Sequence, residues 1–284
     1  MRRISLNLLP ILPLLAVSCG PAENDDPVTP PVYEALRTTE AITVDGALTD
    51  PQWEHAAWTD DFVDISGEGL PAPPLRTRVK LLWNREFLFV GAELEEPHVW
   101  ATLQDRDAIV YQDDDFEVFL DPDGDGLAYF EIEVNPYGTV LDLFMDQPYD
   151  QGGKADLEWD LDGLRAAVAI AGSVNDPSDR DGGWTVELAI PWAGLAPPTG
   201  EKTAKGRSPD PGDSWRMNLS RVDWPMVVVD GSYQKAVLPS RENMHPESNW
   251  VWSAQGTVNM HIPERWGVVL FLADPQNALF DQVP

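Results

Sequence analysis

The stretch AIVYQDDDFEVFLDPDGDGLAYFEIEVN, residues 108–135, decides how the rest of the chain is interpreted. Apolar residues recur at every second position from Phe116 to Leu120 and again from Phe130 to Val134, which is the period of a half-buried strand. Between these runs, residues 121–126 read DPDGDG, a cluster of turn residues. The stretch predicts a β-hairpin with one apolar face and one face of carboxylates and aromatic rings. Such a face suits a sugar, because rings cover its C–H surface while carboxylates accept from its hydroxyls. A solvated face beside a turn is the alternative.

Alternating runs of this kind fill much of the remaining sequence. The clearest is a second hairpin over residues 78–94, with Asn84-Arg85-Glu86 at its turn. Further strands are expected over residues 139–145, 184–190, 215–224 and 266–272. Many short strands separated by turns predict an all-β fold, a jelly-roll-like antiparallel β-sandwich. We expect one domain over residues 33–272 and a C-terminal tail over residues 273–284.

The charge balance restricts the partners. The chain has 19 Lys and Arg against 48 Asp and Glu, a net charge of −29. Nucleic acids and anionic membrane surfaces are negatively charged and attract basic proteins, so neither is an expected partner. One cysteine allows no intrachain disulfide and no cysteine-based zinc site.

The N-terminus has the layout of a secretory signal. Arg2 and Arg3 precede the apolar run Leu6–Val17, which is short for a membrane span. Ala16-Val17-Ser18-Cys19 resembles a bacterial lipobox, so residues 1–18 are expected to be a signal peptide and Cys19 a lipidated residue. Residues 19–32 are expected to be a flexible tether, because Gly20–Pro31 has almost no apolar content. We expect a location in the bacterial cell envelope, with lipid anchoring as the membrane attachment; ordinary secretion is the alternative.

The turn of the central hairpin is a candidate calcium site. Asp121, Asp123, Asp125 and Gly126 match the first six positions of an EF-hand loop, in which alternate carboxylates surround Ca²⁺. Position twelve is Ile132 rather than glutamate, and strands rather than helices flank the turn, so it is not an EF-hand. A calcium-stabilised turn and a metal-free turn both remain open. The sequence contains no nucleotide-binding loop, hydrolase elbow or zinc-protease motif, and no catalytic residue is predicted.

Several segments together resemble the family-9 carbohydrate-binding modules, which are jelly-roll β-sandwiches. They occur in the same order as in that family and extend from Val44 to Phe271, nearly the whole chain after the signal. The matching segments are Val44–Trp53, Lys80–Asn84, Phe87–Val90, Tyr111–Asp121, Gly183–Trp192, Trp215–Asn218, Asn249–Ser253 and Asn259–Gly267. The last two look like a subfamily of family-9-like lipoproteins.

The resemblance also implies a binding site. In the family two tryptophans sandwich a terminal sugar, and a glutamate and an arginine bind its hydroxyls. Tyr111 falls at the first tryptophan and Glu117 at the glutamate, with Asp114 matching between them. The sequence departs from the family where the second tryptophan falls near Met260 or His261, and where the arginine falls at Glu133. The candidate carbohydrate-binding residues are Tyr111, Asp114, Glu117, Arg221, Trp224 and Trp252.

The predicted function is therefore non-catalytic carbohydrate binding by a lipid-anchored protein that supports carbohydrate catabolism, with polysaccharide-processing enzymes as possible partners. Core packing is the alternative role for Trp224 and Trp252, and an ion pair with Arg221 is the alternative role for Glu117. Three other functions stay open. A glycoside hydrolase, or an accessory subunit acting on O-glycosyl bonds, needs two carboxyl groups about 5–9.5 Å apart across a cleft. A haem-binding sandwich of a redox complex needs an axial ligand such as Met217, Met260 or His261. A structural subunit needs an exposed apolar patch.

Overall fold

The computed structural model describes residues 29–67, 69–198, 206–236 and 246–274, and nearly all regular structure in them is β-strand. One sheet has the strand order β8-β7-β6-β5-β11-β15-β1-β3-β4-β10-β9, with β14 pairing to β11 and to β2. Its strands are β1 (Val32–Arg37), β2 (Val63–Asp64), β3 (Thr77–Trp83), β4 (Phe87–Leu94), β5 (Asp115–Asp121), β6 (Tyr129–Val134), β7 (Val140–Met145), β8 (Ala155–Asp156), β9 (Arg165–Ala171), β10 (Gly183–Pro191), β11 (Ser214–Asp223), β14 (Ser248–Val251) and β15 (Gly267–Leu272). A separate hairpin pairs β12 (Met226–Val229) with β13 (Ser232–Lys235).

Helical structure in the described residues is limited to single short turns. They are η1 (Pro51–His55), η2 (Val110–Gln112), η3 (Tyr149–Gln151), η4 (Trp192–Gly194) and η5 (Pro263–Arg265). None of the described helices is long and apolar enough to cross a membrane.

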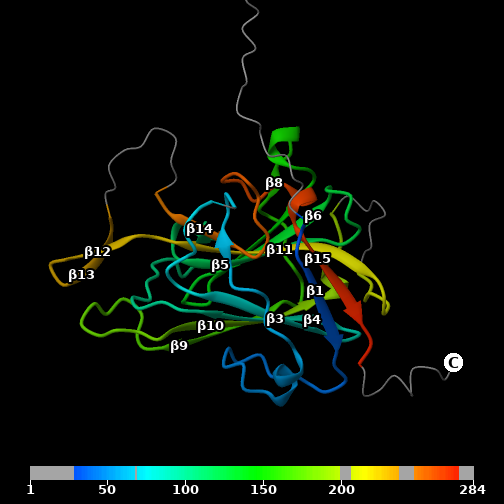
Figure 1. Ribbon diagram of the computed structural model, residues 1–284, viewed down its shortest axis with the longest axis horizontal. Coiled ribbons are helices and arrows are strands. Elements are labelled where there is room, and N and C mark those ends of the chain that lie inside the picture. Colours follow the sequence, from blue (N-terminus) through cyan, green and yellow to red (C-terminus); the bar gives the residue numbers. More distant parts are fainter. Residues whose placement is uncertain (1–28, 68, 199–205, 237–245, 275–284) are drawn as a thin grey trace, which may run out of the picture.

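The sheet curls so that its two halves face each other across the main core (Figure 1). Leu81 of β3, Val90 of β4 and Leu188 of β10 contribute to this core from one half, and Val118 of β5 and Ile132 of β6 from the other. The β-sandwich expected from the sequence is confirmed.

Both predicted hairpins form. β5 and β6 are antiparallel, with Phe116 opposite Val134 and Leu120 opposite Phe130. β3 and β4 are antiparallel as well, and the side chain of Asn84 closes their turn by accepting from the backbone N–H of Glu86. The pairing is not antiparallel throughout: β1 runs parallel to both neighbours, β15 and β3. A fully antiparallel sandwich was expected. The parallel pairs occur where β1 joins the two halves of the curled sheet.

The polar face of the central hairpin is not the solvated face that was the alternative expectation. Every residue of β5, β6 and β7 is buried. A second apolar cluster covers much of the outer face, where Ile65, Val251, Met260 and Trp266 pack on residues such as Phe119. The loop between β14 and β15 supplies two of these covering residues, a long-range contact that alternation alone does not reveal.

Candidate functional site

Four carboxylates share the outer face of β5 and β6, and we call them the acid row: Asp115, Glu117, Glu131 and Glu133. Alternate strand residues point to the same side, and Glu117 lies directly opposite Glu133. No member of the row is more than 5% exposed. The predicted carboxylate face therefore exists, but its carboxylates are buried.

Burial raises the pKa of every member of the acid row. The pKa of Glu117 rises to about 7 and that of Glu133 to about 8. The pKa values of Asp115 and Glu131 also rise well above normal, first through burial and then through repulsion from the neighbouring carboxylates. Among the described residues, the ion-pair partner nearest to the row is His261, whose Nε2 lies 4.0 Å from Glu131 Oε2.

Two half-exposed tyrosines adjoin the acid row. Tyr111 on η2 is 48% exposed, and its backbone N–H donates to Glu133 Oε2 at 3.0 Å. Tyr149 on η3 is 49% exposed. Burial raises the pKa of the Tyr149 hydroxyl, and repulsion from Glu131, Glu133 and Tyr111 raises it further. The acid row thus has accessible aromatic rings beside it, contributed by segments on two sides.

His261 and Met260 lie where the resemblance places a second stacking tryptophan. The His261 ring meets the Tyr149 ring nearly perpendicularly, with centroids 4.5 Å apart, and its Nδ1 is 2.9 Å from the Tyr129 hydroxyl. Burial lowers the pKa of His261 to about 4, so the imidazole is neutral at physiological pH. Met260 is buried in the second apolar cluster. The imidazole fixes the Tyr149 ring, and that ring presents the accessible surface.

Arg221 does not belong to this face. It pairs with Phe116 in the β5–β11 register, whereas Ser220 lies opposite Glu117. Its side chain therefore points between the two halves of the sheet, where it is fully buried and donates to Glu96 at 2.5 Å and to Asp223 at 2.6 Å. The ion pair with Glu117 does not form, because the strand separates the two side chains. The ligand role of Arg221 stays a prediction, for a guanidinium that is buried here among carboxylates.

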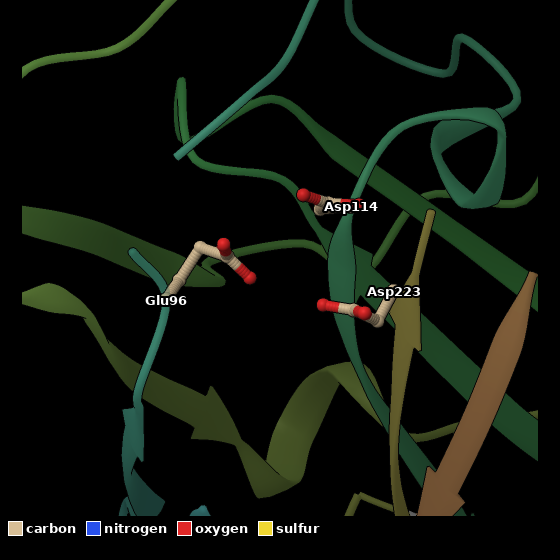
Figure 2. A group of neighbouring side chains, drawn as sticks. All are labelled: Glu96, Asp114 and Asp223. Atoms are coloured by element: carbon tan, nitrogen blue, oxygen red, sulfur yellow. The ribbon is translucent and has the colours of Figure 1, made fainter. Parts of the chain in front are cut away.

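Asp114 belongs to the Arg221 side as well. Figure 2 shows Glu96 and Asp223 pointing toward each other, with Asp114 beside them. Asp114 is 2% exposed and accepts from the backbone N–H of Trp224 at 2.7 Å. Burial raises the pKa of Asp114, and repulsion from Asp223 and Glu96 adds to the rise. Its observed contacts are with the Trp224 backbone and with buried charged groups, so its role as a sugar acceptor stays a prediction.

The two tryptophans among the candidate residues, Trp252 and Trp224, have different surroundings. Trp252 is 6% exposed within the main core, and its ring lies so close to Gly267 that a Cβ there would be 2.3 Å from Trp252 Cζ3. Core packing, the alternative expected for Trp252, is the role that the structure shows. Trp224 is partly exposed, and its Nε1 donates to the carbonyl of Tyr111 at 2.9 Å. Trp224 thus braces the segment that carries Tyr111.

The aspartates of the β5–β6 turn lie together. Oxygens of Asp121, Asp123 and Asp125 lie within 4.8 Å of one another. Asp121 also accepts from the backbone N–H groups of Gly124 and Gly126, so the turn is closed by its own hydrogen bonds. The donor set fits Ca²⁺, which takes carboxylate oxygens. Cys19 lies outside the described residues.

Sequence reasoning missed Tyr149 and Glu131. Tyr149 lies in an irregular stretch between β7 and β8, where no periodicity marks it. Glu131 could have been predicted from the sequence, because it is two residues from Glu133 and alternate residues of a strand point to the same face. In the structure it lies opposite Phe119.

Comparisons with known proteins agree with this fold. A family model described as "Carbohydrate family 9 binding domain-like" matches residues 44–223. Endo-1,4-beta-xylanase A of Thermoanaerobacterium saccharolyticum is 26% identical over 121 residues, which is 43% of this chain and 9% of the xylanase. The chain therefore spans a small part of that enzyme.

Two solved structures share the architecture. A family 9 carbohydrate-binding module of Caldicellulosiruptor kristjanssonii in complex with cellotriose superimposes with a TM-score of 0.55 at 15% identity, covering 87% of this chain and 96% of the module. Its complex with glucose gives a TM-score of 0.52 at 15% identity, over 85% and 96%. At these identities the likeness shows the fold, whereas the family model covers more than half of the sequence. The chain belongs to the carbohydrate family 9 binding domain-like family.

Proposed function

We propose that this protein binds carbohydrate without catalysing a reaction, at the acid row beside Tyr111 and Tyr149. The observation that supports this most directly is the position of two half-exposed aromatic rings next to buried carboxylates. Solved structures of the same fold have cellotriose or glucose bound. Sugar rings stack on aromatic faces through their C–H groups, and carboxylates accept from sugar hydroxyls.

Each residue has a role in this proposal. Tyr111 provides the stacking surface, and Tyr149 provides a second ring that His261 holds in place. Glu117 orients the ligand by accepting from a hydroxyl, since it is on the same side of the sheet as both rings. A tyrosine offers less area than a tryptophan, so we expect weak binding, with a Kd of about 0.1–1 mM or about −4 to −5.5 kcal/mol.

The wider role is part of the same proposal. We infer an envelope protein anchored through lipid on Cys19, which holds the sandwich near polysaccharide-processing enzymes and so supports carbohydrate catabolism. The supporting observations are the lipobox-like segment and the acidic composition. Calcium at Asp121, Asp123 and Asp125 would stabilise the β5–β6 turn, for which the clustered oxygens are the support.

Two of the alternative functions have less support. Met217 is fully buried in the main core, and His261 is engaged by Tyr129, so neither is placed as an axial haem ligand. A glycosidase uses two carboxyl groups on opposite sides of a cleft, whereas Glu117 and Glu133 lie directly opposite each other on neighbouring paired strands.

Sugar titrations of two tyrosine variants test the proposal. Tyr111→Ala should abolish detectable binding of cello-oligosaccharides or glucose by isothermal titration calorimetry. Tyr137→Ala is the matched control: Tyr137 is 42% exposed, and its hydroxyl accepts from Asn175 on another segment. Both variants should melt close to the wild type. Equal loss in the two variants, or retained binding in Tyr111→Ala, would contradict the site.

A further inference from the structure

Two buried carboxylate clusters lie on opposite sides of the β5 region, and only one contains a cation. On the inner side, Arg221 binds Glu96 and Asp223. On the outer side, the acid row has no lysine or arginine within 4.0 Å among the described residues, and its partner His261 is neutral at physiological pH. Buried charges are costly unless they are paired or coordinate a metal, so the outer cluster requires a source of neutralisation.

The outer cluster has the spacing of a hard-cation site. Oxygens of Asp115, Glu117 and Glu133 lie within 4.8 Å of one another. Calcium–oxygen distances of about 2.3–2.6 Å place oxygens on opposite sides of an ion about 4.6–5.2 Å apart. Because the three oxygens are at most 4.8 Å apart, all of them can contact one ion with such distances.

Unpartnered polar atoms provide a second, independent observation. Asp115 is 0% exposed, and its Oδ2 has no hydrogen-bond partner in the described part of the chain. The hydroxyl of Ser220 is likewise buried; it faces Glu117 across the β5–β11 pair and interacts with that carboxyl, but it forms no hydrogen bond of normal geometry with the described residues. Buried polar atoms in native proteins nearly always have partners, so each of these two atoms requires one.

We propose that Asp115, Glu117 and Glu133 bind a divalent cation of the calcium type, with the Ser220 hydroxyl as a fourth oxygen. The ion would satisfy Asp115 Oδ2 and Ser220 Oγ together. Calcium accepts six to eight oxygens, and these residues supply fewer, so positions remain for water or for hydroxyls of a ligand beside Tyr111. Cation binding requires no sugar and is therefore tested separately from the proposed function.

Calorimetric titration of the chelator-treated, full-length protein with CaCl₂, in the absence of sugar, tests the site. We expect the wild type to bind calcium and Asp115→Asn to lose one ion per chain or to bind it about tenfold or more weakly. Asp123→Asn is the matched control, because it makes the same chemical change in the β5–β6 turn, where the separate calcium site is proposed. That variant should retain the ion held by the acid row.

The outcomes separate the possibilities. Absence of calcium binding up to about 5 mM in the wild type would overturn the site, and would mean that the carboxyls are neutralised by protons instead. Equal binding in wild type and Asp115→Asn, or loss only in Asp123→Asn, would overturn it too. If Asp115→Asn does not fold, Glu133→Gln replaces it, since glutamine still accepts from the Tyr111 N–H, and the same outcomes apply.

Discussion

Replacing Arg221 tests whether this residue stabilises the folded protein or contacts a ligand. The guanidinium is fully buried, donates to Glu96, to Asp223 and to the Glu95 carbonyl, and lies 5.0 Å from the centre of the Trp250 ring. Arg221→Met retains much of the aliphatic volume but leaves the buried Glu96 and the partly buried Asp223 without their cation. Breaking a buried ion pair by removing one partner costs about 3–5 kcal/mol, because the remaining charge stays desolvated. At about 2–4 °C per kcal/mol for a domain of this size, the melting temperature should fall by about 6–20 °C.

Urea unfolding followed by tryptophan fluorescence measures this loss, and sugar titration of the folded variant measures its binding. Adding Glu96→Gln to Arg221→Met should restore part of the stability, about 1–2 kcal/mol, because it removes one uncompensated charge. Sugar binding by the folded fraction should match the wild type. An unchanged melting temperature together with lost sugar binding would refute the structural role and return Arg221 to the ligand site.

Three further predictions concern pH, calcium and the anchor. Burial raises the pKa of Glu96 to about 7. The folded state then binds more protons than the unfolded state between about pH 4.5 and 7, so the stability of the wild type relative to Glu96→Gln should fall as pH rises through that window. Equal urea-derived differences at pH 5 and pH 8 would contradict this. Calcium at the β5–β6 turn should add about 2.7 kcal/mol at 100 times its Kd. Asp123→Asn should remove that gain, and an identical calcium-dependent rise in melting temperature in wild type and variant would exclude the turn. Finally, Cys19→Ala should move the protein from the membrane to the soluble fraction, and a wild type that is already soluble after export would argue against the anchor.

The strands were predictable because their signal is local. Apolar residues at alternate positions define β5 and β6, and Asn84 marks the β3–β4 turn within a few residues of the strands it joins. The parallel pairing of β1 with β15 joins opposite ends of the chain, and no local pattern specifies it. Local periodicity therefore gives the strands, whereas the way in which the sheet curls depends on distant contacts.

The position of Arg221 illustrates the limit for the site. β5 and β11 lie about a hundred residues apart in sequence, and their register cannot be read from either strand alone. In the observed register Ser220 faces Glu117. A shift by one residue would place Arg221 on the outer face instead, next to the carboxylate that it was expected to meet. Glu117 and Arg221 were therefore expected on the strands that carry them, but the face of the sheet to which Arg221 points could not be read from its own strand.

The burial of the acid row is the strongest structural argument for a function at this face. A loop that only stabilised the sandwich would be expected to cover apolar side chains, as Met260 and Trp266 do over Phe119. Instead, the same covered face includes four carboxylates, and burying them raises their pKa values. That arrangement weakens the fold unless a proton, a cation or a ligand hydroxyl compensates. The nearby rings of Tyr111 and Tyr149 are about half exposed. The proposed binding at this face would compensate the buried acids and would cover the exposed rings.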